Sequence, residues 1–162
     1  MKAPEPEKAQ AAGTTRRLQA LAVAGWPTSR LARETGLAPS YLSRVLKGDL
    51  AEVPVSMARM VAAVYVQLGA VSPGLSGVSH IAARAARERA AAALWAPPAA
   101  WDDDTIDDPA AIPQWTGSCG TTRGALAHDR DGIPLCPPCE GALRRRRLRD
   151  QAHAARTTAT HA

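Results

Sequence analysis

The chain has 162 residues, which is enough for one ordinary domain or for two small domains joined by linkers. Only 4% of the residues are aromatic and none is phenylalanine, so any core must be built mainly from alanine, leucine and valine. The net charge of +5 favours an anionic partner, and the odd number of cysteines, three, argues against a disulfide framework and directs attention to metal binding.

Residues 1–13 are predicted to form a flexible tail because proline, glutamate and lysine are frequent and no apolar segment is present. Such a start predicts no signal peptide, and no later run is long and apolar enough to span a bilayer. We therefore expect a cytoplasmic, nucleoid-associated protein without membrane contact.

Five helices are predicted between residues 14 and 94, separated by loops rich in glycine and proline. Their first residues are expected to be capped by the hydroxyl side chains of Thr14, Thr28, Ser56 and Ser79. The expected helices cover residues 14–24, 28–35, 39–47, 56–68 and 79–94. Arginines of the last helix, Arg84, Arg87 and Arg89, either contact phosphates or form a solvated face.

The second and third of these helices form a helix-turn-helix pattern. Gly36 stands where the chain must turn with a positive φ, and Pro39 suits the first turn of the next helix. That helix is expected to present five side chains outward: Ser40, Tyr41, Ser43, Arg44 and Lys47. Two cations, hydroxyls and an aromatic ring suit contacts with a DNA groove. The alternative is the solvated face of an ordinary helical corner.

This pattern resembles the helix-turn-helix domain of the lambda-repressor and Cro type, over roughly residues 14–70. The resemblance rests on Leu31-Ala32, Gly36, Leu37, Leu42-Ser43 and Val45-Leu46. It implies DNA binding with residues 39–47 in the major groove, and homodimers on two half-sites. No clear dimer helix is visible in the sequence, so monomeric binding supported by the second basic module is the alternative. A departure is Ala38, where many members place a Ser or Thr cap. We also expect Arg16 and Arg17, in the first helix, to contact phosphates.

Residues 95–115 contain five aspartates, four prolines and three tryptophans, which exclude a long regular element. The segment is predicted to be an acidic linker or strap, held to the helical domain by Trp95 and Trp101. Alternatives are a divalent-cation site, an imitation of a nucleic-acid backbone that covers a basic surface, and a docking segment for a protein partner. Its character is similar to that of small helix-turn-helix proteins from actinobacteria and their phages.

Four metal-binding residue types follow at short spacing: Cys119, His128, Cys136 and Cys139. Three thiolates and one imidazole make a complete tetrahedral set for one structural zinc ion and leave no open position for a reacting water. Glycines between them are expected to allow a short loop around the ion. The segment, residues 116–156, resembles a small zinc-finger or knuckle module. An iron–sulfur cluster or labile zinc in a sensor, or free thiols, are alternatives.

A helix over residues 140–155 is predicted directly after the cysteine pair, and residues 157–162 are predicted to be a disordered tail. The helix contains a basic run of Arg144, Arg145, Arg146, Arg147 and Arg149. These guanidinium groups cover most of the helix circumference, so contact with nucleic-acid phosphate is expected. A solvated basic tail is the alternative.

The sequence therefore predicts a mainly α-helical chain: a five-helix domain, an acidic linker and a zinc-stabilised module with a basic helix. The expected function is sequence-specific binding of double-stranded DNA by a transcriptional regulator. No nucleophile–base pattern and no phosphate loop is present, so an enzyme is not expected. The alternatives are a metal sensor that regulates DNA binding, and a protein-interaction adaptor or anti-regulator on a helix-turn-helix scaffold.

Overall fold

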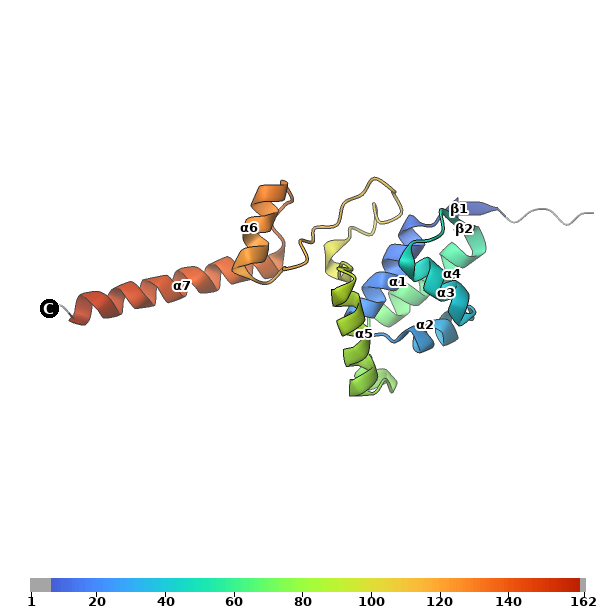
Figure 1. The fold of residues 1–162 in the computed structure, drawn as a ribbon, viewed down its shortest axis with the longest axis horizontal. Coiled ribbons are helices and arrows are strands. Elements are labelled where there is room, and N and C mark those ends of the chain that lie inside the picture. The colour runs from blue at the N-terminus through green and yellow to red at the C-terminus, as the bar shows by residue number, and fades with distance from the viewer. Residues whose placement is uncertain (1–6, 161–162) are drawn as a thin grey trace, which may run out of the picture. The chain divides into compact units, whose positions relative to one another are not determined.

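The structure is a computed structural model that describes the backbone of residues 7–160 (Figure 1). It divides into two compact units, Met1–Pro113 and Gln114–Ala162. Seven α-helices and a two-stranded sheet are present among the described residues, so the protein is mainly α-helical. None of the described helices is long and apolar enough to cross a membrane.

The first unit contains five of the helices in the order expected from the sequence. Its elements are β1 (Lys8–Gln10), α1 (Ala12–Ala24), α2 (Thr28–Thr35), α3 (Pro39–Lys47), β2 (Glu52–Pro54), α4 (Val55–Gly69) and α5 (His80–Ala92), with short 3-10 turns η1 (Gly74–Ser76) and η2 (Pro98–Ala100). The second unit contains α6 (Thr122–Asp131) and α7 (Pro137–Thr160).

Helix α1 is central to the first unit and contacts α3, α4 and α5. Trp26, which follows it, is fully buried in an aliphatic core formed by α1 to α4. Polar bonds add to this packing: the Thr15 hydroxyl donates to the Val45 carbonyl at 3.0 Å, and Gln19 donates to the Leu46 carbonyl at 2.7 Å. Both bonds connect α1 to α3 and fix how α3 presents its outer face.

Three of the four predicted helix caps are wrong. Helix α1 begins at Ala12, so Thr14 lies inside it and is buried, while Pro27 and Pro54 precede the first residues of α2 and α4. Both prolines are the N-cap residues and have extended backbone, and a proline side chain has no group that could accept from the first amides of a helix. The fourth cap is confirmed, because the Ser79 hydroxyl accepts from the Ala82 amide at 3.2 Å.

The sheet was not predicted. Strand β1 pairs antiparallel with β2, with Ala9 opposite Val53, so a flexible tail is wrong for residues 8–13 and an irregular loop is wrong for residues 52–54. The rest of the predicted tail, residues 1–6, lies outside the described residues. Neither strand has a strong β-forming pattern, and it is the burial of Val53 and Ala11 that holds the pair against the helices.

Helix α6 was also not predicted, because Gly120, Gly124 and Gly132 suggested a loop. Instead, the Thr121 hydroxyl caps the helix by accepting from the Gly124 amide at 3.0 Å, and Gly132 ends it in the left-handed conformation. Helix α7 begins three residues before the predicted start and includes both Cys139 and the basic run. The second unit is therefore a helix pair and not a loop followed by a helix.

Candidate metal centre and nucleic-acid surface

The second unit brings together the three cysteines and the histidine that the sequence singled out. Cys136, Cys139 and His128 are buried, and Cys119 is partly exposed. The ligand atoms of all four side chains lie within 4.8 Å of one another, and Cys119 Sγ is 3.4 Å from His128 Nε2. The four residues can therefore hold one metal ion.

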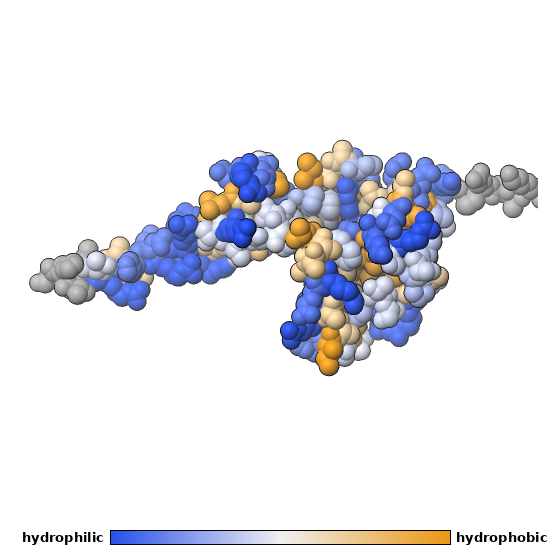
Figure 2. Space-filling model, in the orientation of Figure 1, coloured by the Kyte–Doolittle hydropathy of each residue, from blue (hydrophilic) through white to orange (hydrophobic). Residues whose placement is uncertain are grey.

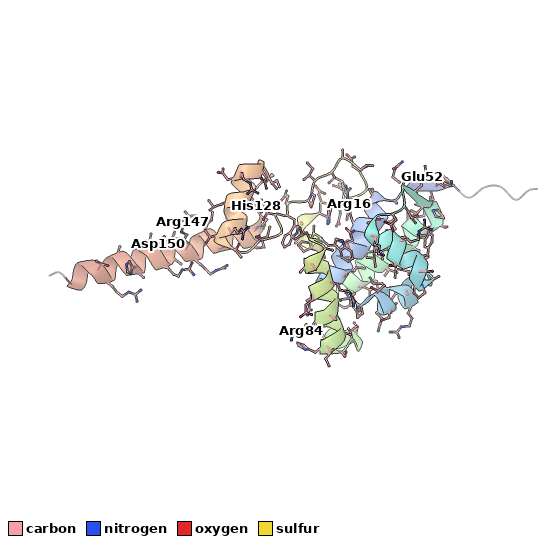
Figure 3. The ribbon with its side chains drawn as sticks, in the orientation of Figure 1. Arg16, Glu52, Arg84, His128, Arg147 and Asp150 are labelled. Carbon is pink, nitrogen blue, oxygen red and sulfur yellow. The ribbon has the colours of Figure 1, made fainter. Side chains whose placement is uncertain are left out.

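Each ligand is positioned by a separate piece of local structure. His128, labelled in Figure 3, lies on the buried face of α6. Cys119 precedes α6, Cys136 directly precedes α7, and Cys139 lies in the first turn of α7. The amides of Cys139 and Glu140 donate to the Cys136 carbonyl at 3.0 Å, which turns the chain into α7 directly at the site. The ligand set thus joins both helices of this unit.

The separation of two of the ligand atoms can be compared with that around a tetrahedral ion. Metal–ligand bonds of about 2.3 Å to sulfur and about 2.0 Å to nitrogen place neighbouring ligand atoms roughly 3.5–3.8 Å apart. The observed 3.4 Å between Cys119 Sγ and His128 Nε2 is close to that value. The whole set, with its ligand atoms within 4.8 Å of one another, could therefore close around one metal ion.

Backbone groups support the thiolates. The Gly120 amide donates to Cys139 Sγ and the Thr116 amide donates to Cys119 Sγ, both at 3.4 Å. Such donors stabilise negative charge on sulfur. Neither residue was predicted to belong to the site, because a backbone amide leaves no residue-type signal in a sequence.

The thiols differ in how readily they ionise. Burial raises the pKa of Cys119, but hydrogen bonds from Thr116 and His128 outweigh this effect and bring the pKa down to about 7. Burial raises the pKa of Cys136 to about 12. A bound cation replaces the protons on such a cluster and allows all three sulfurs to be thiolates together.

His128 contributes Nε2 to the site, while its Nδ1 is buried without a hydrogen-bond partner among the described residues. Metal-bound histidines usually donate the other ring N–H to an acceptor that fixes the ring. Here the packing of the α6 face holds the ring, since only 1% of His128 is exposed.

We predict that Gly124→Ala weakens metal binding strongly, although Gly124 is not a ligand. A Cβ at this position would lie 2.2 Å from the Ser118 carbonyl oxygen and 2.9 Å from the Cys119 amide nitrogen, so α6 could no longer approach the loop that carries Cys119. Competition with a chromophoric chelator should show at least about a tenfold lower zinc affinity. Gly141→Ala on α7, where the added methyl would meet only the flexible end of the Arg145 side chain at 3.3 Å, is the control for replacing a glycine by alanine in this unit. Equal affinities for Gly124→Ala and the unaltered chain would contradict the close approach.

The outer face of α3 carries the residues predicted to read DNA. Ser40, Arg44 and Lys47 are exposed, whereas Tyr41 and Ser43 are half-buried and Tyr41 packs against the core. Gly36 has φ of 67° and ends α2, and Pro39 is the first residue of α3. No ion pair involves Arg44 or Lys47 among residues 7–157, whose side chains are described.

Arg16 and Arg17, predicted to contact phosphates, instead hold the acidic segment (Figure 3). The Arg16 guanidinium donates to the backbone carbonyls of Ile106 at 2.8 Å and Ala111 at 3.0 Å, and to those of Asp108 and Pro109, and it stacks on Trp101. Arg17 forms a two-bond ion pair with Asp107. A role in phosphate binding stays a prediction and would require this segment to move.

The acidic segment approaches α1 closely enough to require a glycine. A Cβ on Gly13 would lie 1.8 Å from an Asp107 carboxylate oxygen and 2.9 Å from the Asp107 Cα. Ile106 is fully buried in this contact. Residues 101–111, which we name the acidic strap, therefore belong to the first unit rather than forming an extended linker.

The predicted arginine run lies on α7, where all of its members are exposed: Arg144, Arg145, Arg146, Arg147 and Arg149. In Figure 2 most of α7 forms a hydrophilic surface. Arg146 lies 3.8 Å from Asp150, and Arg145 donates to the Gly120 carbonyl at 3.3 Å. For Arg144, Arg147 and Arg149 no acidic partner is found within residues 7–157.

Comparison with protein-family models, curated proteins and solved structures gave no match. No family is therefore identified. The similarity to repressor-type helix-turn-helix domains and to zinc knuckles stays a prediction.

Proposed function

We propose that the protein binds double-stranded DNA in a sequence-specific manner, with α3 as the recognition helix, and acts as a transcriptional regulator. One observation carries this proposal. Arg44 and Lys47 on α3 have no acidic partner within residues 7–157, whereas Arg17, Arg30 and Arg84 in the same unit are paired with Asp107, Glu34 and Glu88. Unpaired cations beside hydroxyl groups on one short helix suit base edges and phosphates.

We further propose that the four ligands hold one structural zinc ion. The four ligands of an iron–sulfur cluster are divided between at least two iron atoms, so as a set they stand further apart than four ligands around one ion. The mutual separation of at most 4.8 Å among the ligand atoms favours a single ion. The exposed arginines of α7 would then add contacts to the phosphate backbone that raise DNA affinity without sequence preference.

The proposal predicts that DNA affinity depends on α3. Selection from a random pool of duplexes should yield a preferred sequence, and Arg44→Ala should weaken binding to it about tenfold or more while relaxing preference at one position. Arg84→Ala is the matched control because Arg84 is equally exposed but pairs with Glu88 on α5. Fluorescence anisotropy at several salt concentrations measures both affinity and its salt dependence.

Two results would overturn the proposal. A pool without enrichment, with affinity set by salt alone, would make the protein a nonspecific binder. Equal affinities for Arg44→Ala and Arg84→Ala would remove α3 from the interface and favour an adaptor role. Homodimerisation, and a protein partner for the acidic strap, stay predictions that this experiment does not require.

A further inference from the structure

A cavity of about 330 Å³ lies within the first unit, lined by side chains from α1, α2, α3 and α5 and by Trp95. This volume falls in the range of sites for small organic molecules, roughly 300–1,000 Å³. The cavity adjoins the C-terminal half of α3, because Ser43, Leu46 and Lys47 line it.

The apolar part of the lining contains two indole rings, those of Trp26 and Trp95. Trp26 is fully buried, and its indole N–H has no hydrogen-bond acceptor among the described residues. Trp26 therefore forms the floor of the cavity, and Trp95, which is only partly buried, offers the accessible ring. An aromatic wall favours a flat ring system, since offset stacking adds to the burial of area. The occupant is therefore expected to contain a planar ring.

The polar part of the lining is positively charged. Lys47 and Arg89 line the cavity, and neither forms an ion pair with any residue between 7 and 157, where side chains are described. Thr28 and Ser43 add hydroxyl groups, and none of the lining residues is acidic. This arrangement favours an anionic group on the ligand and disfavours a cation.

We propose that this cavity binds a small aromatic carboxylate, with its ring against Trp95 above the buried Trp26 and its carboxylate towards Lys47 and Arg89. The site requires nothing from the proposed DNA-binding function. Its regulatory consequence does rest on that function: a bound carboxylate contacts Lys47 on α3 and competes with phosphate for the same cation, so it should lower DNA affinity.

Titration of the full-length protein with indole-3-carboxylate tests the site directly. The chain has four tryptophans, so its indole N–H groups give four amide-type NMR signals that Trp95→Phe, Trp101→Phe and Trp115→Phe variants assign. The Trp26 and Trp95 signals should shift in a saturable manner, and those of Trp101 and Trp115 should not. Neutral indole, which has the same ring without the carboxylate, should bind at least about tenfold more weakly.

Arg89→Gln should reduce the affinity for indole-3-carboxylate about tenfold and leave the affinity for indole unchanged. Arg84→Gln is the matched control on the same helix, since Arg84 pairs with Glu88 and does not line the cavity. The proposal is overturned if no signal shifts up to about 10 mM ligand, if indole binds equally well, or if both variants lose affinity alike. Binding without any change in DNA affinity would overturn only the regulatory consequence, and a protein that binds no DNA leaves the NMR result standing.

Discussion

Replacing Cys139 by serine is expected to abolish stoichiometric zinc binding and to unfold residues 114–160 while the first unit remains folded. The hydrophobic cluster of the second unit consists of Ala125, Cys136 and Cys139, with Cys119 and Leu143 at its edge. Three of these five residues are candidate metal ligands, so very little other apolar burial holds this unit together. Structural zinc sites contribute about 10–16 kcal/mol of apparent binding free energy, and a unit of this size has no comparable source of stability.

Zinc content by mass spectrometry and amide hydrogen exchange across α6 and α7 would measure this effect. His128→Ala should behave like Cys139→Ser, because both remove a buried ligand. His153→Ala is the control, since His153 is an exposed histidine on α7 outside the ligand set. Protection of α6 amides that survives both ligand substitutions and chelation would show that the helix pair folds without metal.

Replacing Arg16 by methionine is expected to release the acidic strap from α1. The substitution removes all four hydrogen bonds to strap carbonyls and the charge that stacks on Trp101 at 4.6 Å. Only two of those bonds are partly buried, so we expect a loss of about 2–3 kcal/mol in unfolding free energy. Limited proteolysis within residues 101–111 and urea unfolding of the full chain would report the release.

Two further variants separate the causes. Asp107→Asn should cost less than about 1 kcal/mol, because the Asp107 side chain is 68% exposed and asparagine keeps an oxygen that accepts from Arg17, whose side chain is 12% exposed. Gly13→Ala should resemble Arg16→Met, because its methyl group would displace the Asp107 backbone. A strap that stays protected from protease in both Arg16→Met and Gly13→Ala would contradict the role assigned to the Arg16 contacts.

The Asp107 contact also has a defined dependence on pH. A hydrogen bond from Arg17 lowers the pKa of Asp107 below its ordinary value of 3.8. The unfolded chain therefore binds this proton more readily than the folded one, and the contribution of the pair is complete above pH 3.8 and is lost as the pH falls through the lowered pKa. The pair is thus fully ionised at neutral pH.

The sequence was most informative where chemistry and periodicity acted over short distances. The apolar spacing of Leu42, Val45 and Leu46 predicted α3 and its inner face, and glycine at position 36 predicted the turn before it. The metal ligands were found because cysteine and histidine at short spacing have few other uses in a chain with three cysteines.

The remaining features depended on contacts between distant residues. No local pattern in residues 8–10 predicts that they pair with residues 52–54. The paired residues Ala9 and Val53 are 44 residues apart in the sequence, and the pair is stabilised by burial against the helices. Gly124 looked like a turn residue, yet it lies in α6 and is needed for close approach to Ser118. Arg16 looked like a phosphate contact because its carbonyl partners lie about 90 residues away.

Cys136 directly precedes α7 and Cys139 lies in its first turn, and this position has a consequence for the rest of that helix. Residues 144–157 are exposed, so they resemble a helical peptide in water, for which starting the first turn is the unfavourable step and extension is nearly neutral. An ion bound by Cys136 and Cys139 would fix the first turn. The arginines would then follow on the same helix, which is about 36 Å long in all. A bound metal ion should therefore nucleate the helix, and its effect on helix content should decrease towards the C-terminus. Without the ion the charges of the basic run would be spread along a coil, and with the ion they would be concentrated on a helix.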